Sequence, residues 1–64
     1  MRKIEEVVNE SKALKAIVYR DSEWNEYHVK HYIGGIYQVD ADYHTDDKAD
    51  AQHSARAFVK RYSE

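Results

Sequence analysis

Apolar and polar residues alternate with a period of two through the middle of the chain, as they do in β-strands that bury one face. In the segment 27–33 the first set of alternating side chains is Tyr27, Val29, His31 and Ile33. In the segment 37–44 the first set is Tyr37, Val39, Ala41 and Tyr43. An earlier segment, 16–20, is rich in β-branched and aromatic residues and predicts another strand. We therefore expect three consecutive strands.

Two glycines, residues 34–35, separate the second and third of these strands, and the register decides how the chain turns. A two-residue loop would place Ile36 opposite Ile33, and the apolar set of one strand would then share a face with the polar set of the other. A three-residue loop that includes Ile33 removes this conflict, because it pairs His31 with Tyr37. Its third position needs a left-handed backbone, which glycine adopts at little cost. We therefore predict a bulged hairpin.

Helical spacing is found at both ends of the chain. Between residues 2 and 12, the residues at helical spacing are Ile4, Val7, Val8 and Ser11. They predict a short amphipathic helix. Near the other end, Thr45 or Asp46 is a good N-cap, and a stripe of small and apolar residues follows. The stripe consists of Ala51, Ala55, Phe58, Val59 and Tyr62. The predicted fold is α+β in the order α-β-β-β-α: a three-stranded antiparallel meander packed on one face by helices, with its other face open.

The composition is that of an ordinary folded domain, and we expect residues 1–64 to form a single one. The net charge of −2, from ten Lys and Arg against twelve Asp and Glu, gives no overall reason to expect nucleic acid or a membrane as partner. Cysteine is absent, which excludes disulfides, thiolate metal sites and cysteine nucleophiles. The apolar runs are too short to span a bilayer and the first residues do not resemble a secretion signal, so we expect a cytoplasmic protein.

Four histidines are the candidates for metal chemistry. His28 and His31 are three positions apart, so on a strand they point to opposite faces and do not form a metal site; His31 is expected in the apolar face. A second group could hold a divalent cation where the third strand meets the last helix: His44, Asp46, Asp50 and His53. A helix cap with exposed histidines explains the same residues, and we favour that interpretation. Without a nucleophile motif or a phosphate loop, we predict neither an enzyme nor a cofactor.

The open face of the predicted sheet is the candidate binding surface, because Tyr and Trp are favoured anchors of protein interfaces. The predicted partner-binding residues are Trp24, Tyr32, Ile36, His28 and Lys30. In the predicted register Tyr32 lies opposite Ile36 and His28 lies opposite Asp40. The function we expect is that of a small non-enzymatic protein-binding module. The sheet edge could also accept a strand from a partner. A homodimer could form through the sheet edge or through the open face.

Nucleic-acid binding is the alternative function. It would combine the exposed aromatic side chains with four basic residues, Lys30, Arg56, Lys60 and Arg61. Asp40 and Asp42, predicted on the same face as Lys30, count against it, because they would repel a phosphate backbone.

Two resemblances add to this interpretation. The order of elements resembles the double-stranded-RNA-binding domain. That family has lysines at the start of its last helix, where this chain has Asp46-Asp47-Lys48-Ala49-Asp50. RNA binding in the manner of that family is therefore not expected. Residues 42–51 are similar to small uncharacterised tailed-bacteriophage proteins, in which a strand that ends in an aromatic residue precedes a Thr-Asp-Asp cap and an alanine-rich helix. This resemblance implies an accessory protein that binds and modulates a host protein in the host cytoplasm.

Overall fold

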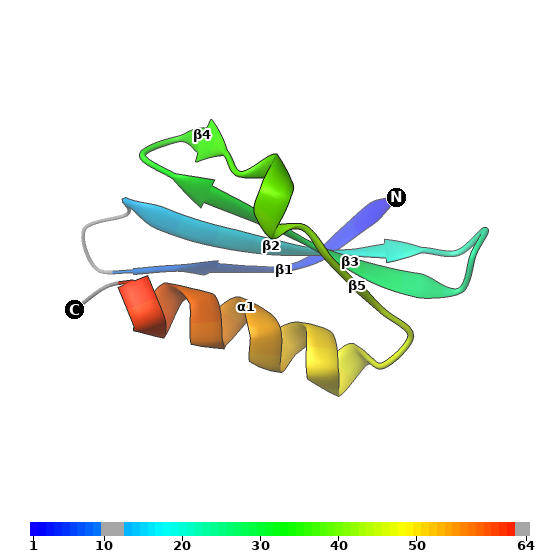
Figure 1. The fold of residues 1–64 in the computed structure, drawn as a ribbon. Helices are drawn as coiled ribbons and strands as arrows, with labels where there is room; N and C mark the ends of the chain where they lie inside the picture. The colour runs from blue at the N-terminus through cyan, green and yellow to red at the C-terminus, as the bar shows by residue number, and fades with distance from the viewer. Residues whose placement is uncertain (10–12, 63–64) are drawn as a thin grey trace.

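The computed structural model of the chain describes residues 1–9 and 13–62 and shows an α+β fold (Figure 1). The main strands are β1 (Arg2–Val8), β2 (Leu14–Asp21) and β3 (Glu26–Ile33), which pair antiparallel in sequence order. The short strands β4 (Ile36–Tyr37) and β5 (Tyr43–Thr45) follow, separated by a 3-10 turn, η1 (Val39–Ala41), and the helix α1 (Lys48–Tyr62) ends the fold. No helix among the described residues is long and apolar enough to cross a membrane.

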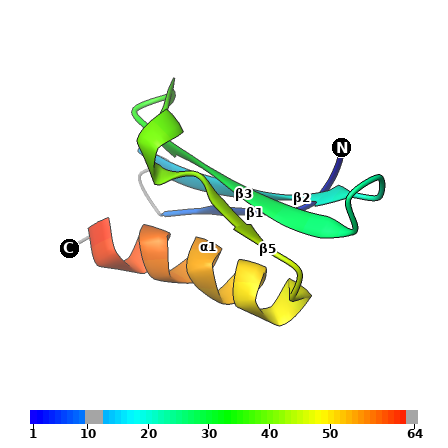
Figure 2. The same ribbon diagram turned by 45° about the vertical axis from the view of Figure 1, so that its right-hand side comes forward.

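Strands β4 and β5 both pair with the same edge of β3, at its two ends. β4 lies opposite Tyr32 and Ile33, and β5 lies opposite residues 27–29. The helix α1 runs across one face of the sheet, and it is the only α-helix among the described residues; the short turn η1 lies beside β3 (Figures 1 and 2). The predicted α+β class and antiparallel sheet are therefore confirmed, whereas the order of elements differs from the prediction.

The predicted N-terminal helix is wrong, because residues 2–8 form the edge strand β1. A β-bulge explains the error. Lys3 pairs with Tyr19 and Glu5 pairs with Val18, so Ile4 is an extra residue in β1. This insertion lets Ile4 and Val7 both pack against the core, although residues three apart on a regular strand point to opposite faces. A bulged strand has thus reproduced the apolar spacing of a helix. The rest of the predicted helix, residues 10–12, lies outside the described residues.

The predicted three-residue hairpin loop is also wrong. The loop has two residues, Gly34 and Gly35, whose φ angles of 59° and 83° are both left-handed, as in the turns that join two-residue hairpins. Ile33 pairs with Ile36, and Tyr32 pairs with Tyr37. The prediction assumed one continuous strand from residue 37 to residue 44, but η1 interrupts it and shifts the register before β5 begins. The facial conflict that argued against the shorter loop therefore does not arise.

The core lies between α1 and the face of the sheet that α1 covers. Its buried residues are Ala16, Val18, Val29, Ala51, Ala55 and Val59. The predicted role of Ala51 and Ala55 is confirmed, because both are fully buried and let the helix lie close to the strands. Phe58 packs against this core, and the centroid of its ring lies 4.3 Å from the centroid of the His31 imidazole ring. The predicted Tyr62 contact lies outside the described side chains.

The helix cap differs by one residue from the prediction. Asp47, rather than Thr45 or Asp46, precedes the first helical residue, and its Oδ1 accepts a hydrogen bond from the Ala49 backbone N–H at 2.9 Å. The Thr45 hydroxyl in turn accepts from the Asp47 N–H at 3.2 Å. Two successive side-chain contacts therefore fix the point where the chain leaves β5 and enters α1.

Candidate functional site: the open face of the sheet

The face of the sheet opposite α1 carries Tyr19, Tyr32 and Tyr37 together with His28 and His44, and we call it the open face. The pairing aligns its residues in rows across the strands: Lys15–Tyr32–Tyr37, Ile17–Lys30 and Tyr19–His28–His44. Strand β1 adds Val8, Glu6 and Lys3 at the margin of the same three rows. The open face is thus a consequence of strand alternation, because the neighbouring residues on β2 and β3 point into the core.

Two lysines lie over the tyrosine rings of the open face. The Lys15 Nζ is 4.9 Å from the centroid of the Tyr32 ring. The Lys30 Nζ is 5.3 Å from the Tyr19 centroid and 5.6 Å from the Tyr37 centroid. These distances lie within the range of cation–π attraction. The result is a platform in which each ammonium group is held at the surface by aromatic rings.

The centre of this platform is apolar. Ile17, directly opposite Lys30, is only 6% exposed although no helix covers it. The rings of Tyr32 on β3 and Tyr37 on β4 lie 5.5 Å apart, measured between centroids, and are tilted at 41°. Long side chains that cover apolar surface while keeping their polar ends in water give this pattern.

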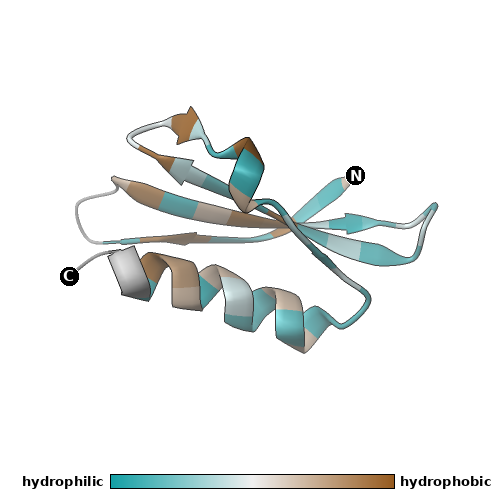
Figure 3. Ribbon diagram, in the orientation of Figure 1, coloured by the Kyte–Doolittle hydropathy of each residue, from teal (hydrophilic) through white to brown (hydrophobic). Residues whose placement is uncertain are grey.

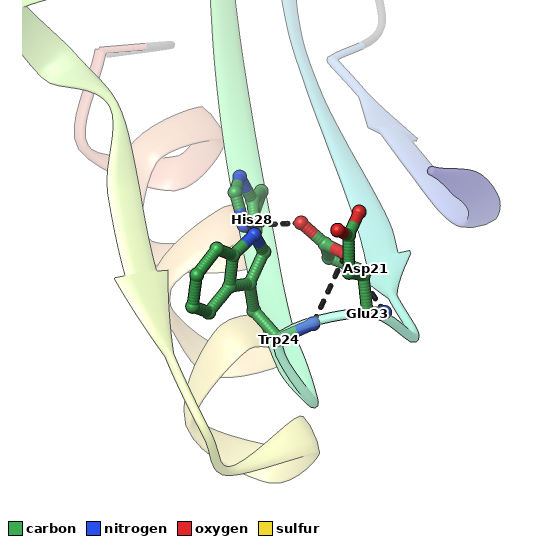
Figure 4. A network of polar contacts seen from close by, with 4 residues as sticks. All are labelled: Asp21, Glu23, Trp24 and His28. Carbon is green, nitrogen blue, oxygen red and sulfur yellow. Dashed lines mark hydrogen bonds and ion pairs between the residues drawn. The ribbon is translucent and has the colours of Figure 1, made fainter.

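A second cluster occupies the hairpin end of the open face. The imidazole rings of His28 and His44 stack with their centroids 4.0 Å apart, and the His28 Nε2 is 3.7 Å from the Asp21 Oδ2. The loop that follows Asp21 exposes Trp24, whose side chain lies on the same side of the hairpin as His28 (Figure 4). Trp24 is 70% exposed, so its side chain does not cover the core.

The Asp21 carboxylate also shapes this loop. Its Oδ1 accepts hydrogen bonds from the Glu23 N–H at 3.1 Å and the Trp24 N–H at 3.4 Å (Figure 4). The turn is completed by Asn25, which has a left-handed backbone with φ 54°. The hydrogen bonds to Asp21 and the left-handed turn at Asn25 together hold Trp24 in an exposed position, which an apolar side chain would not otherwise favour.

At the other end of the open face, the Tyr37 hydroxyl donates a hydrogen bond to the Asp42 carboxylate. This hydrogen bond raises the pKa of Tyr37 to about 12. Asp40, predicted opposite His28, lies instead in the exposed η1 turn, and His44 takes the place opposite His28. The acidic row predicted along this face is therefore not present in the described strands.

The predicted partner-binding residues divide into two groups. His28, Lys30 and Tyr32 share the open face as predicted, with Trp24 at its end. Ile36 does not join them: it pairs with Ile33, one position before Tyr37, and so points to the α1 side of the sheet. It is 68% exposed in the apolar region formed by β4 and η1 (Figure 3).

Sequence reasoning missed much of the open face, including Lys15, Tyr19, Tyr37 and His44. The first two could have been found from the alternation in β2, which places Lys15, Ile17 and Tyr19 on one face. Tyr37 and His44 depend on the loop length and on the return of β5 to β3, for which the local pattern carries no signal.

The basic set proposed for nucleic acid is not brought together. Arg56 and Lys60 lie on α1, on the opposite layer from Lys30, and the Arg56 Nη2 is 3.2 Å from the Glu5 Oε2. Glu5 also accepts a hydrogen bond from the Gln52 amide at 2.9 Å, so this carboxylate fastens α1 to β1. The side chain of Arg61 lies outside the described residues.

The alternative metal group is separated as well. His44 stacks on the open face, whereas Asp50 accepts a hydrogen bond from the Tyr43 hydroxyl beside α1. That hydrogen bond lowers the pKa of Asp50 and raises the pKa of Tyr43. Within residues 1–9 and 13–62, no group of three or more His, Asp or Glu side chains is placed to hold a metal ion.

The two other histidines differ in their surroundings as predicted. His31 is 5% exposed on the α1 side of the sheet, and burial lowers its pKa, partly offset by the Ala41 backbone and the Asp42 charge. Its Nδ1 has no hydrogen-bond partner among the described residues. His28 lies on the opposite face, which confirms that the pair cannot converge on one ion.

Comparison with known proteins finds no relative for this chain. No family model matches it, and it matches no curated protein and no solved structure.

Proposed function

We propose that this chain is a small non-enzymatic protein-binding module and that the open face is its contact surface. The observation that carries the proposal is a sheet face without a covering helix that bears three tyrosines, two stacked histidines and, at its end, a tryptophan that is 70% exposed. Tyrosine and tryptophan supply large contact areas, and they dominate the binding energy of protein interfaces.

The charges of this face support a partner segment of acidic and apolar character. Lys3, at the margin, already pairs with Glu6 at 3.2 Å. Lys15 and Lys30 are held over tyrosine rings, and no carboxylate in the described part of the chain forms an ion pair with either of them. A partner carboxylate could therefore pair with each ammonium group while apolar partner side chains pack on the rings.

Docking on the open face is better supported than strand addition at the β1 edge. The outer edge of β1 has no strand beside it in the described sheet. However, β1 carries the charged residues Arg2, Lys3, Glu5 and Glu6 and a bulge at Ile4. Edge charges and bulges are the features by which proteins prevent strand addition, so we also place a homodimer contact, if the chain forms one, on the open face.

The finer part of the proposal is an accessory role of the bacteriophage type, in which the partner is a host protein. It rests on the sequence similarity of residues 42–51 alone. In the fold these residues form β5, the Asp47 cap and the first turn of α1, so they support the position of His44 rather than the contact itself.

Binding of single-stranded nucleic acid is the second candidate, and one observation favours it: Asp40 lies in η1 rather than on the open face, which removes one of the two carboxylates that argued against phosphate, although Asp42 still contacts Tyr37 at the end of that face. Two features count against it. The lysines cover faces of the rings on which bases would stack, and the net charge is −2. Arg56 and Lys60 lie on α1, on the far side of the sheet, and cannot extend the surface.

The test starts with capture of partners by the tagged chain from bacterial lysate, with and without nuclease. A retained protein is then purified, and its affinity is measured by calorimetry for wild type, for Trp24→Ala with Tyr32→Ala, and for Lys15→Gln with Lys30→Gln. Lys60→Gln on α1 is the matched control for charge. Circular dichroism confirms that each variant is folded.

We expect each double variant to weaken binding about tenfold or more and the control to leave it unchanged. Unchanged affinity in the folded Trp24→Ala, Tyr32→Ala variant would show that the open face is not the contact. Loss of all captured material on nuclease treatment, with affinity that falls steeply with salt, would replace the proposal by the second candidate.

A further inference from the structure

A cavity of about 500 Å³ lies on the α1 side of the sheet, beyond the beginning of the helix. Besides Met1, its lining consists of residues of β1, of the β2–β3 hairpin and of the first turn of α1: Arg2, Ile4, Arg20, Ser22, Tyr27 and Lys48. Its volume is in the range of pockets that take small ligands. It is separate from the open face, because Arg20 and Tyr27 alternate with the open-face residues Tyr19 and His28 along their strands.

The charge of this cavity is opposite to that of the chain. Three cationic side chains line it, and no carboxylate is among the described residues that do. The whole chain has a net charge of −2. A concentration of positive charge in a concave site of an acidic protein is an electrostatic signal for an anionic ligand.

Two of the cations face each other directly. Arg2 pairs with Arg20 across β1 and β2. Like charges directly opposite on a sheet are destabilising, and neither arginine forms an ion pair with a carboxylate in the described part of the chain. An anion between them would remove this repulsion.

Arg20 is oriented before any ligand arrives. Its Nη1 donates to the Tyr27 hydroxyl and its Nη2 donates to the Asn25 Oδ1, each at 2.7 Å, and its guanidinium lies 5.1 Å from the Tyr27 ring centroid. A guanidinium has five N–H donors, so donors remain for an oxyanion. Because the side chain is already fixed, little conformational entropy is lost when it binds.

We propose that this cavity binds a small phosphate monoester. The phosphate would lie between Arg2, Arg20 and Lys48, with the Ser22 hydroxyl as a further donor, since planar guanidinium groups match phosphate oxygens. The remainder of the ligand would lie against Ile4 and the Tyr27 ring, because the cavity is larger than a phosphate alone requires and has this apolar wall.

The test is a titration of the labelled protein, followed by amide NMR shifts, with inorganic phosphate, with phenyl phosphate and with chloride at matched ionic strength. Arg2→Gln and Lys48→Gln remove one cation each from exposed positions. Lys3→Gln removes the same charge from the next residue of β1, on the other face of the sheet. Lys60→Gln does so at the far end of α1.

We expect saturable shifts at Arg2, Arg20 and Lys48, tighter binding of phenyl phosphate than of phosphate, and a loss of about tenfold in affinity for each of the two cavity variants. The two control variants should bind as wild type does. If Lys3→Gln lowered the affinity as much as the cavity variants do, the effect would be one of net charge alone, and the proposal would be overturned. The absence of saturable shifts would also overturn it.

A short single-stranded oligonucleotide that binds at the cavity while phenyl phosphate does not would also overturn it, in favour of a nucleic-acid backbone. This proposal is independent of the protein-binding function, because the variants that test the two lie on opposite faces of the sheet.

Discussion

Replacement of Val18 by alanine tests the packing of α1 on the sheet most directly. Val18 and Val29 are the largest side chains that are fully buried, and Val18 lies in the core with Ala51 and Ala55. The substitution removes two carbon groups, worth about 0.8 kcal/mol each, and leaves a cavity that adds about 1 kcal/mol. We therefore expect a loss of about 2–3 kcal/mol in the free energy of unfolding.

That loss is large for a chain of this size, whose total stability should be about 3–10 kcal/mol. The midpoint of thermal unfolding should fall by roughly 10–20 °C. Urea denaturation followed by circular dichroism measures the free energy. Val8→Ala is the matched control, because Val8 also lies in a strand but is 43% exposed, so the same loss of strand propensity occurs with a smaller loss of burial and no closed cavity in the core. Equal losses for the two variants would refute the assignment of the core.

Three further outcomes concern the turn and the buried histidine. Gly35→Ala should cost about 1 kcal/mol in unfolding free energy, because its φ of 83° is left-handed, whereas Gly34→Asn should be tolerated; equal costs in urea denaturation would argue against the two-residue turn. Burial lowers the pKa of His31 below 6.5 in the folded state, so the contribution of the neutral imidazole to stability should be fully present above about pH 6.5 and should be lost as the pH falls through the folded-state pKa. In His31→Leu the unfolding free energy should vary less between neutral and mildly acidic pH, and an unchanged pH dependence would contradict this role.

The parts of the fold that could be predicted from sequence are those in which one regular pattern determines one regular element. The alternation around Val29 predicts β3 with His28 and His31 on opposite faces, and the structure confirms it. The spacing of Ala51 and Ala55 predicts the buried stripe of α1. In both segments the residues that face the core repeat with the period of the element itself.

The parts that could not be predicted contain an irregularity that changes the period. A bulge at Ile4 makes a strand resemble a helix, and the 3-10 turn at residues 39–41 breaks an apparently continuous alternation into two short strands. The local residues allow both conformations, and the pairing with β2 and β3 decides between them. The same holds for the candidate sites, because the His28–His44 stack and the Arg2–Arg20 pair join residues from strands whose register depends on these irregularities.

Both candidate surfaces follow from the position of α1, the one α-helix in the described part of the chain, beside a long hairpin. A helix of 15 residues is about 22 Å long, whereas the longest extent of the molecule is 34 Å. The tip of the β2–β3 hairpin therefore extends beyond the first turn of α1 in both ribbon views (Figures 1 and 2). On the α1 side, this overhang leaves the cationic cavity between Arg2, Arg20 and Lys48. On the other side, the described sheet has no α-helical layer, although Ile17 is only 6% exposed there. A second helix on that side would bury more apolar surface, but it would also cover the platform that we propose as the binding face.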